Sequence, residues 1–279
     1  GLGFALRLKC KKLQRLPTIN LIWKISMQTN SDVASRLVAH RGFSSDYPEN
    51  TLLSIERAFH AGAKYVEFDV QFSKDAIPIV VHDVNLARTS GQDIEISALN
   101  AADASRMSAA YKSKFGDKFL GLTIPTLAEV IDLFSLWRDR KLFLEIKRSG
   151  LKSLGNEIAI NNILTVIESV LPDVTLISFD HTVLRYIKEN TAARTGWVFE
   201  HWQPDTLDIA LSLQPDYVFV DAECVPLSVN VLPRQQWKWA VYEIDDLDSV
   251  QHWVDKGADL VETNAIGHLI KQLYNKESR

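Results

Sequence analysis

The stretch 64-KYVEFDVQFSKDAIPIVVHD-83 predicts two apolar strands joined by a tight turn. Only residues 71–76 separate strand 64–70 from strand 77–82, whereas a parallel crossover needs about a dozen residues or more. The second strand must therefore return as a hairpin that turns near Lys74 and Asp75 and pairs Asp69 roughly with Val81. This geometry brings His82 back beside the carboxyl end of the first strand.

Two carboxylates lie on one face of the first strand. Glu67 and Asp69 are two residues apart, and strand side chains alternate between faces, so both point the same way. Carboxylates on an apolar strand repel each other and are costly to desolvate, and a divalent cation removes both penalties. The alternative is a solvated face with two ordinary acids, because charged residues usually lie outside.

The neighbouring motifs favour the metal. Strand 141–147 repeats the pattern, with Glu145 and Lys147 on one face, and a third carboxylate beside a cation suits a metal that binds phosphate oxygens. His40 ends strand 37–40 and His82 ends the hairpin strand. Either histidine could be structural, but imidazole transfers protons near neutral pH, so two of them beside the acids indicate a catalytic site.

These motifs resemble those of the glycerophosphodiester phosphodiesterase family. The similarity runs from about Arg36 to Leu273 and rests on His40-Arg41-Gly42, Pro48-Glu49-Asn50-Thr51, Glu67-Phe68-Asp69 and His82-Asp83. It implies a TIM (β/α)8 barrel that uses one divalent metal ion, Mg²⁺ or Ca²⁺, to hydrolyse glycerophosphodiesters to sn-glycerol 3-phosphate and an alcohol. The implied roles are acid and base for His40 and His82, metal ligands for Glu67, Asp69 and Glu145, and phosphate binding for Arg41 and Lys147.

The later part of the chain contains two departures from the family pattern. Trp239 falls where the family tends to have a tryptophan, which makes it a candidate pocket residue. Members usually continue from that tryptophan into Thr-Val-Asn and end the last strand in Thr-Asp, whereas Ala240-Val241-Tyr242-Glu243 and Thr263-Asn264 stand here. Neither position carries the expected chemistry, so we expect the same reaction with a different pocket for the leaving alcohol.

His201 is a second candidate for the substrate pocket. It follows the strand that ends near Phe199, on the side where βα-loops build active sites, and ordinary loop composition is the alternative. The other histidines fall on predicted helices or helix starts and are expected to be surface or packing residues: His60, His181, His252 and His268.

Apolar strands alternate with helical patterns after the first 36 residues, which is typical of a βαβ sheet. Parallel strands are expected near 37–40, 64–70, 141–147, 174–179, 194–199, 216–221, 237–242 and 259–263. Helical spacing occupies 52–59, 126–138, 156–170, 181–190, 205–213, 246–256 and 265–274. The fold class is therefore α/β, a TIM barrel with an extra hairpin strand and a small inserted cap.

The predicted domains are a basic extension over residues 1–32 and a single catalytic barrel over 33–279. Residues 84–122 interrupt the barrel, and Tyr111, Phe115 and Phe119, spaced four apart, indicate a packed helical cap rather than direct substrate contact. The inserted cap remains a candidate for substrate specificity because it would lie over the catalytic mouth.

Charge is unevenly distributed along the chain. The net charge is −4, but residues 1–26 hold six basic residues and no acid, so the remainder has 25 basic and 35 acidic residues and a net charge of −10. That balance argues against a nucleic-acid partner. The basic leader could be an extension from upstream translation or cloning, an amphipathic surface anchor, or, with least support, a secretory signal.

With two cysteines, Cys10 and Cys224, and no apolar run of about 20 residues, we expect a soluble cytoplasmic protein without a disulfide framework. Its expected partner is a small glycerophosphodiester. Two other functions stay open. One is a lysophospholipase D or phosphoinositide-type phospholipase, and the other is a non-catalytic barrel that binds a ligand.

Overall fold

The computed structural model describes residues 29–277, so the expectations for the basic leader fall outside the described residues. Within that range eight parallel strands form a closed barrel, because β1 hydrogen-bonds to both β2 and β9. The parallel strands are β1 (Leu37–Ala39), β2 (Tyr65–Phe72), β4 (Lys141–Ile146), β5 (Val174–Ser178), β6 (Arg194–Phe199), β7 (Tyr217–Asp221), β8 (Lys238–Tyr242) and β9 (Leu260–Thr263). The predicted TIM barrel and its eight strands are confirmed.

The ninth strand is the predicted hairpin. Strand β3 (Pro78–Val80) runs antiparallel to the end of β2, with Val70 opposite Val80. The amide of Val81 donates to the carbonyl of Asp69 at 3.0 Å, which is the expected pairing. This hairpin delivers His82 to the carboxyl end of β2.

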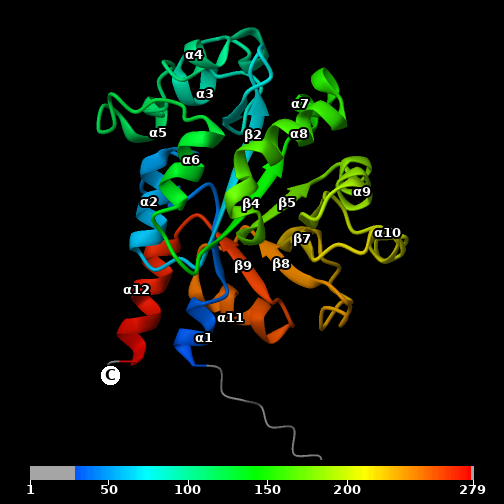
Figure 1. Cartoon of the computed structure of the whole chain (residues 1–279). Helices are drawn as coiled ribbons and strands as arrows, with labels where there is room; N and C mark the ends of the chain where they lie inside the picture. The colour runs from blue at the N-terminus through cyan, green and yellow to red at the C-terminus, as the bar shows by residue number, and fades with distance from the viewer. Residues whose placement is uncertain (1–28, 278–279) are drawn as a thin grey trace, which may run out of the picture.

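Helices cover the outside of the barrel (Figure 1). Their apolar faces pack on outward-facing strand residues in one continuous core that includes Phe68, Leu144 and Leu176. The helices are α1 (Asn30–Ala34), α2 (Leu52–His60), α6 (Leu127–Phe134), α7 (Arg148–Leu154), α8 (Asn156–Ile167), α9 (His181–Asn190), α10 (Thr206–Leu213), α11 (Leu247–Asp255) and α12 (Ile266–Glu277). Single 3₁₀ segments η2 (Glu168–Asp173) and η3 (Ala222–Cys224) follow α8 and β7.

Two helices were not expected from the sequence. α7 begins directly after Lys147, and α1 lies beside α12, where Asn30 Nδ2 donates to the carbonyl of Leu273 at 3.1 Å (Figure 1). Helix α1 therefore spans the expected domain boundary at 33. Among residues 29–277, each helix falls short of the length and apolar character that crossing a membrane requires.

Aromatic side chains fill the lower interior of the barrel. The ring of Phe143 packs against Tyr217 and Phe219 at centroid distances of 4.9 and 5.0 Å, and stacks on Tyr65 at 5.7 Å. This layer closes the barrel beneath the carboxyl ends of the strands, so polar groups above it face a closed floor rather than a channel.

Residues 84–122 form a separate lobe beside the outer end of β2, at the top of Figure 1. It contains α3 (Ala87–Ser90), η1 (Ile96–Ala98), α4 (Ala101–Ala104) and α5 (Lys112–Phe115) around a small core of its own. Tyr111, Phe115 and Phe119 pack edge to face, and Phe119 reaches Tyr47 at 5.8 Å, so the aromatic series packs as expected. It is not one helix, because α5 ends at Phe115 and Gly116 has φ +61.

Candidate active site

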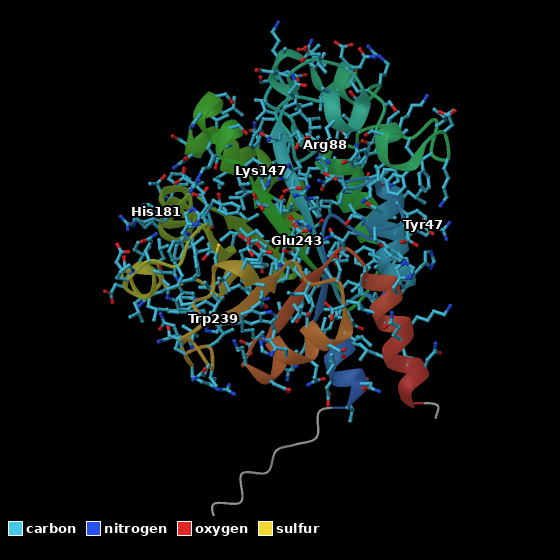
Figure 2. All side chains as sticks on the ribbon, turned by 180° about the vertical axis from the view of Figure 1, so that it is seen from behind. Tyr47, Arg88, Lys147, His181, Trp239 and Glu243 are labelled. Atoms are coloured by element: carbon cyan, nitrogen blue, oxygen red, sulfur yellow. The ribbon has the colours of Figure 1, made fainter. Side chains whose placement is uncertain are left out.

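A polar layer lies directly above the aromatic floor. The β2–β4 register pairs Glu67 with Phe143 and Asp69 with Glu145, so strand alternation turns all three carboxylates inward from two neighbouring strands. Each is buried, and one oxygen from each lies within 4.8 Å of the others. The neighbouring Lys147 borders the same small cavity as Glu243, and Figure 2 labels both residues.

This acidic group fits a hard divalent cation. Its donors are all carboxylate oxygens, the ligand type that Mg²⁺ and Ca²⁺ prefer. Glu67 Oε1 is buried and has no hydrogen-bond partner among the described residues. A buried acceptor without a partner destabilises the fold by about 1–3 kcal/mol unless a ligand satisfies it. The group can therefore hold a metal ion.

Asp69 is the most constrained of the three carboxylates. Asn50 clamps it twice, since its Nδ2 donates to Asp69 Oδ2 at 2.7 Å and its Oδ1 accepts from the Asp69 amide at 3.0 Å. Lys147 Nζ lies 2.6 Å from Asp69 Oδ1, and Arg41 Nε lies 3.2 Å from Oδ2. These partners fix one ligand before any metal arrives.

The carboxyl groups differ in pKa because their neighbours differ. Burial raises the pKa of Glu67 well above its ordinary value of 4.5, and the charge of Asp69 adds to that rise. Burial also raises the pKa of Glu145, although Lys147 opposes it. For Asp69, burial is outweighed by Lys147 and Arg41, which hold its pKa well below the usual range. The group therefore contains one firmly ionised acid and two that retain protons more readily.

His40 follows β1 in a tight turn. Arg41 has φ +54, and a Cβ on Gly42 (φ +80) would lie only 2.5 Å from the backbone of Ser54, so the turn requires glycine there. This turn aims the Arg41 amide at Glu67 Oε2, 3.0 Å away, and leaves His40 Nε2 3.9 Å from the same oxygen. Burial lowers the pKa of His40 to about 4, so its ring is neutral at pH 7.

His82 is oriented by a chain of charged groups. Its Nδ1 lies 2.7 Å from Asp83 Oδ1, and Asp83 Oδ2 accepts from Arg88 Nε at 2.6 Å. Arg88 comes from α3 and forms a two-pronged contact with Glu49, at 2.7 and 2.9 Å. Glu49 also accepts from Arg41 Nη1 at 2.9 Å. The inserted lobe is thereby tied to both histidine-bearing turns.

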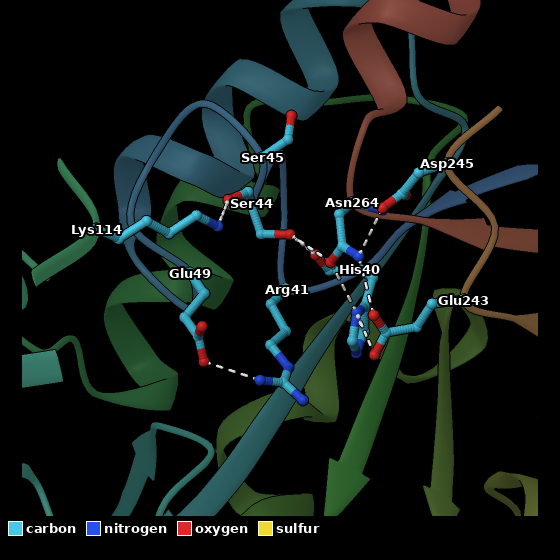
Figure 3. A pocket seen from close by; sticks show the side chains of 9 residues that line it. All are labelled: His40, Arg41, Ser44, Ser45, Glu49, Lys114, Glu243, Asp245 and Asn264. Atoms are coloured by element: carbon cyan, nitrogen blue, oxygen red, sulfur yellow. Dashed lines mark hydrogen bonds and ion pairs between the residues drawn. The ribbon is translucent and has the colours of Figure 1, made fainter. Parts of the chain in front are cut away.

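Three cavities meet at this layer. A cavity of about 90 Å³ lies over the carboxylates and is bounded by His40, His82 and Lys147. One of about 380 Å³ opens on the His40 side between Lys114 and Glu243 (Figure 3), and one of about 370 Å³ opens on the His82 side beside Phe179. A central chamber with an arm past each histidine matches a phosphodiester, which carries one ester group on either side of phosphorus.

The structure brings together seven of the nine predicted site residues: His40, Arg41, Glu67, Asp69, His82, Glu145 and Lys147. Trp239 does not line the substrate pocket, contrary to our expectation. It is an outward position of β8, its Nε1 donates to the carbonyl of Pro233 at 2.9 Å, and its ring stacks on Trp202, so it belongs to the core behind the barrel wall (Figure 2). Tyr242 occupies the inward position instead.

His201 lies outside the central chamber. It is exposed and borders a separate cavity of about 200 Å³ beside Phe199 and Gln203. The four remaining histidines lie on α2, α9, α11 and α12, as expected.

A fourth buried carboxylate was missed by the sequence analysis. Glu262 points inward from β9, borders the chamber, and has an Oε1 without a hydrogen-bond partner among the described residues. Burial raises its pKa well above the ordinary value, and Glu243 and Glu145 add to the rise. Glu262 could have been found in the sequence, because it is a carboxylate within a predicted apolar strand, as Glu67 is.

Our expectation for Glu243 and Asn264, the two places where the chain differs from the family pattern, was also wrong. We expected neither position to touch the chemistry, but both side chains contact His40. Asn264 Oδ1 lies 3.1 Å and Glu243 Oε1 3.5 Å from His40 Nδ1. Both residues also border the 380 Å³ cavity, so the expected change of pocket shape remains a prediction.

Comparison with known proteins identifies relatives of this chain in sequence and in fold. The model of the glycerophosphoryl diester phosphodiesterase family matches residues 40–268. A glycerophosphodiester phosphodiesterase of Caldanaerobacter subterraneus subsp. tengcongensis is 29% identical over 235 residues, which cover 82% of this chain and 93% of that protein.

Solved structures share the fold. An Oleispira antarctica phosphodiesterase in complex with the product sn-glycerol-3-phosphate superimposes with a TM-score of 0.75 and 25% identity, covering 89% of this chain and all of that one. A glycerophosphodiester phosphodiesterase from Thermotoga maritima gives a TM-score of 0.66 at 23% identity, over 85% of this chain and 97% of the other.

Proposed function

The chain belongs to the glycerophosphoryl diester phosphodiesterase family and is a phosphodiester hydrolase, and from this premise we propose how its residues cleave glycerophosphodiesters to sn-glycerol 3-phosphate and an alcohol. One observation carries the proposal. The buried group of Glu67, Asp69 and Glu145 lies in one small chamber with a histidine on either side.

We assign the three carboxylates to one divalent cation, Mg²⁺ or Ca²⁺, which when bound supplies positive charge to the phosphate oxygens. Lys147 and Arg41 add fixed positive charge at the same chamber and bind the phosphate. The side chains of Lys147 and Arg41 both form ion pairs with Asp69, so the carboxylate that would bind the metal also holds these two positive groups in place.

His40 and His82 act on opposite oxygens of the phosphate. One accepts the proton of the attacking hydroxyl and the other donates a proton to the leaving alcohol. Each borders a separate arm of the cavity, which gives each ester oxygen a histidine of its own. The small number of cysteines supports a reducing, cytoplasmic compartment.

The test is release of glycerol 3-phosphate from a panel of glycerophosphodiesters and lysophospholipids, with and without chelator. We expect chelator-sensitive release from the glycerophosphodiesters. Substituting alanine for Glu67, Asp69 or Glu145 should abolish activity and metal binding while the barrel stays folded by circular dichroism. An Asp69→Ala enzyme that is active in chelator, or turnover of lysophospholipids alone, would contradict the proposal.

The histidine pair is tested by leaving-group chemistry. His40→Ala and His82→Ala should each lower the rate by roughly 10²- to 10⁴-fold, the usual contribution of acid/base catalysis. A nitrophenyl ester needs little protonation of its leaving group, so it should rescue the variant that lacks the acid far more than the one that lacks the base. Equal rescue would exclude separate roles.

A further inference from the structure

Asn264 is the hub of a hydrogen-bond network behind His40 (Figure 3). Its Oδ1 lies 3.1 Å from His40 Nδ1 and accepts from Ser44 Oγ at 2.8 Å. Its Nδ2 donates to Glu243 Oε2 at 2.9 Å and to Asp245 Oδ2 at 3.2 Å. Every hydrogen-bonding atom of this amide therefore has a partner.

The partners decide which way the amide points. Carboxylates only accept hydrogen bonds, so the NH₂ group of Asn264 must face Glu243 and Asp245. Its carbonyl oxygen then faces His40. Because a carbonyl only accepts, the His40 ring must carry its proton on Nδ1 to complete this contact.

The consequence lies at the other ring nitrogen. In a neutral ring with its proton on Nδ1, Nε2 has a free lone pair. His40 Nε2 is the atom that faces the carboxylate chamber, 3.9 Å from Glu67 Oε2. The amide therefore places the proton-transferring nitrogen of His40 at the reaction centre.

The backbone around Asn264 is held independently of its side chain. Asp245 Oδ1 accepts from the Asn264 amide and from Thr263 Oγ1, both at 2.8 Å. Removing the carboxamide should thus leave the loop after β9 in place and disturb mainly His40.

We infer that Asn264 is a positioning residue for His40, and that Glu243 fixes the amide orientation on which this depends. The inference rests on the proposed role of His40 in proton transfer. The two histidines are then oriented by different chemistry. The nearest partner of His82 Nδ1 is the carboxylate of Asp83 at 2.7 Å, whereas the nearest partner of His40 Nδ1 is the amide oxygen of Asn264 at 3.1 Å, with Glu243 Oε1 farther away at 3.5 Å.

The first test is Asn264→Leu, which keeps the side-chain volume and removes the hydrogen bonds. We expect kcat to fall about 10- to 100-fold, the usual effect of losing an orienting partner, with little change in KM. In ¹⁵N-histidine NMR spectra at pH 8, the His40 signals, identified with His40→Ala, should lose the single Nδ1–H tautomer pattern. Asn190→Leu is the control, because Asn190 is exposed at the end of α9, far from His40, and its Nδ2 donates to the carbonyl of Tyr186.

The second test exchanges the amide and the acid. Asn264→Asp alone places a third carboxylate beside Glu243 and Asp245 and removes the donor between them, so kcat should fall. Adding Glu243→Gln supplies a new donor at position 243 while the carboxylate at 264 still accepts from His40 Nδ1. The double variant should recover most of the lost kcat and the Nδ1–H pattern. The comparison of the single and double variants tests the inference even if Asn264→Leu does not fold.

The outcomes separate this inference from the proposed function. Unchanged kcat and an unchanged tautomer in Asn264→Leu, with an inactive His40→Ala, would overturn the inference and leave the proposed function intact. The inference would also fall if the double variant were no better than Asn264→Asp. Full activity in His40→Ala would instead remove the proposed role of His40 in proton transfer, on which the inference rests, without contradicting the hydrolysis itself.

Discussion

At the scale of single residues, the buried layer of the site contains more negative than positive side chains. Four carboxylates, Glu67, Asp69, Glu145 and Glu262, are each at most 8% exposed, and two cations, Arg41 and Lys147, face them. With all groups ionised the layer would carry −4 + 2 = −2, the charge that one divalent cation cancels. Without a cation, burial and, after it, the charges of neighbouring carboxylates favour the protonated forms of Glu67 and Glu262, so the pKa values of both are raised.

Replacing Glu262 should affect stability and activity in opposite directions. Glu262→Leu removes a buried acceptor that has no partner, so we expect the chelated protein to gain about 1–3 kcal/mol in urea unfolding. The same change takes one negative charge from the chamber, so metal affinity and turnover should fall. Glu262→Gln is the control that keeps a polar group without the charge. If the Glu262→Leu protein were less stable, the native Glu262 side chain would stabilise the fold rather than destabilise it as an unpaired acceptor.

Lys147 contacts two of the three proposed ligands, with Nζ 2.6 Å from Asp69 and 2.5 Å from Glu145. It therefore competes with a cation for them. Lys147→Met keeps the stem and removes the charge, so metal affinity should stay similar or rise while the rate falls, because charge on the phosphate is less stabilised. Metal titration and the rate at saturating metal are measured on the same variant. An unchanged saturated rate with weaker metal binding would mean that Lys147 only neutralises Glu145.

At the scale of elements, the inserted lobe acts on the site through α3. Arg88 joins Glu49 after β1 to Asp83 after β3, so one side chain braces both histidine-bearing turns. The lobe is therefore expected to influence catalysis even where it does not touch substrate.

Arg88→Met tests this connection. Because Arg88 is about one-third exposed, we expect a stability loss of only about 1 kcal/mol, but a larger loss of kcat because Asp83 no longer holds His82. The control is Arg106→Met, which removes an exposed arginine of the same lobe that pairs with nearby Asp103. Melting temperature and kcat are compared for both. Equal, small effects on kcat would show that Asp83 holds His82 unaided.

Local patterns explain how much of this could be predicted from the sequence. Two-residue alternation predicted the inward face of β2 and β4, and connection length predicted the β3 hairpin, because both depend on neighbouring residues. Asn50, Arg88 and Asn264 could not be found in this way, since their partners lie 19, 39 and 224 residues away and carry no periodic signal. Trp239 was misplaced because a motif match ignores which face of β8 a residue occupies.

At the scale of the whole molecule, the raised carboxyl pKa values predict how stability depends on pH. A carboxyl group whose folded pKa is raised binds more protons in the folded state. Its stabilising effect is present below the unfolded value, about 4.5 for Glu67 and Glu262, and is lost as pH rises through the folded value. Asp69 has a lowered pKa and acts oppositely, losing its contribution only as pH falls below about 4.

The carboxyl groups of Glu67 and Glu262 should therefore make the metal-free protein less stable as pH rises above about 4.5, whereas the lowered pKa values of His40 and His82 act in the opposite sense below about 6.5. A divalent cation that binds the deprotonated carboxylates should restore the stability that they lose. At a free cation concentration about 100 times its dissociation constant, the stabilisation is about 2.7 kcal/mol, or roughly 5–10 °C in Tm. We expect the difference in Tm between cation and chelator to be larger at pH 8 than at pH 5, because protons compete for the ligands at low pH. Melting curves at both pH values measure it, with Asp69→Ala as the control that should show no cation effect. A difference that is independent of pH, or equal in Asp69→Ala, would place the cation away from the carboxylate layer.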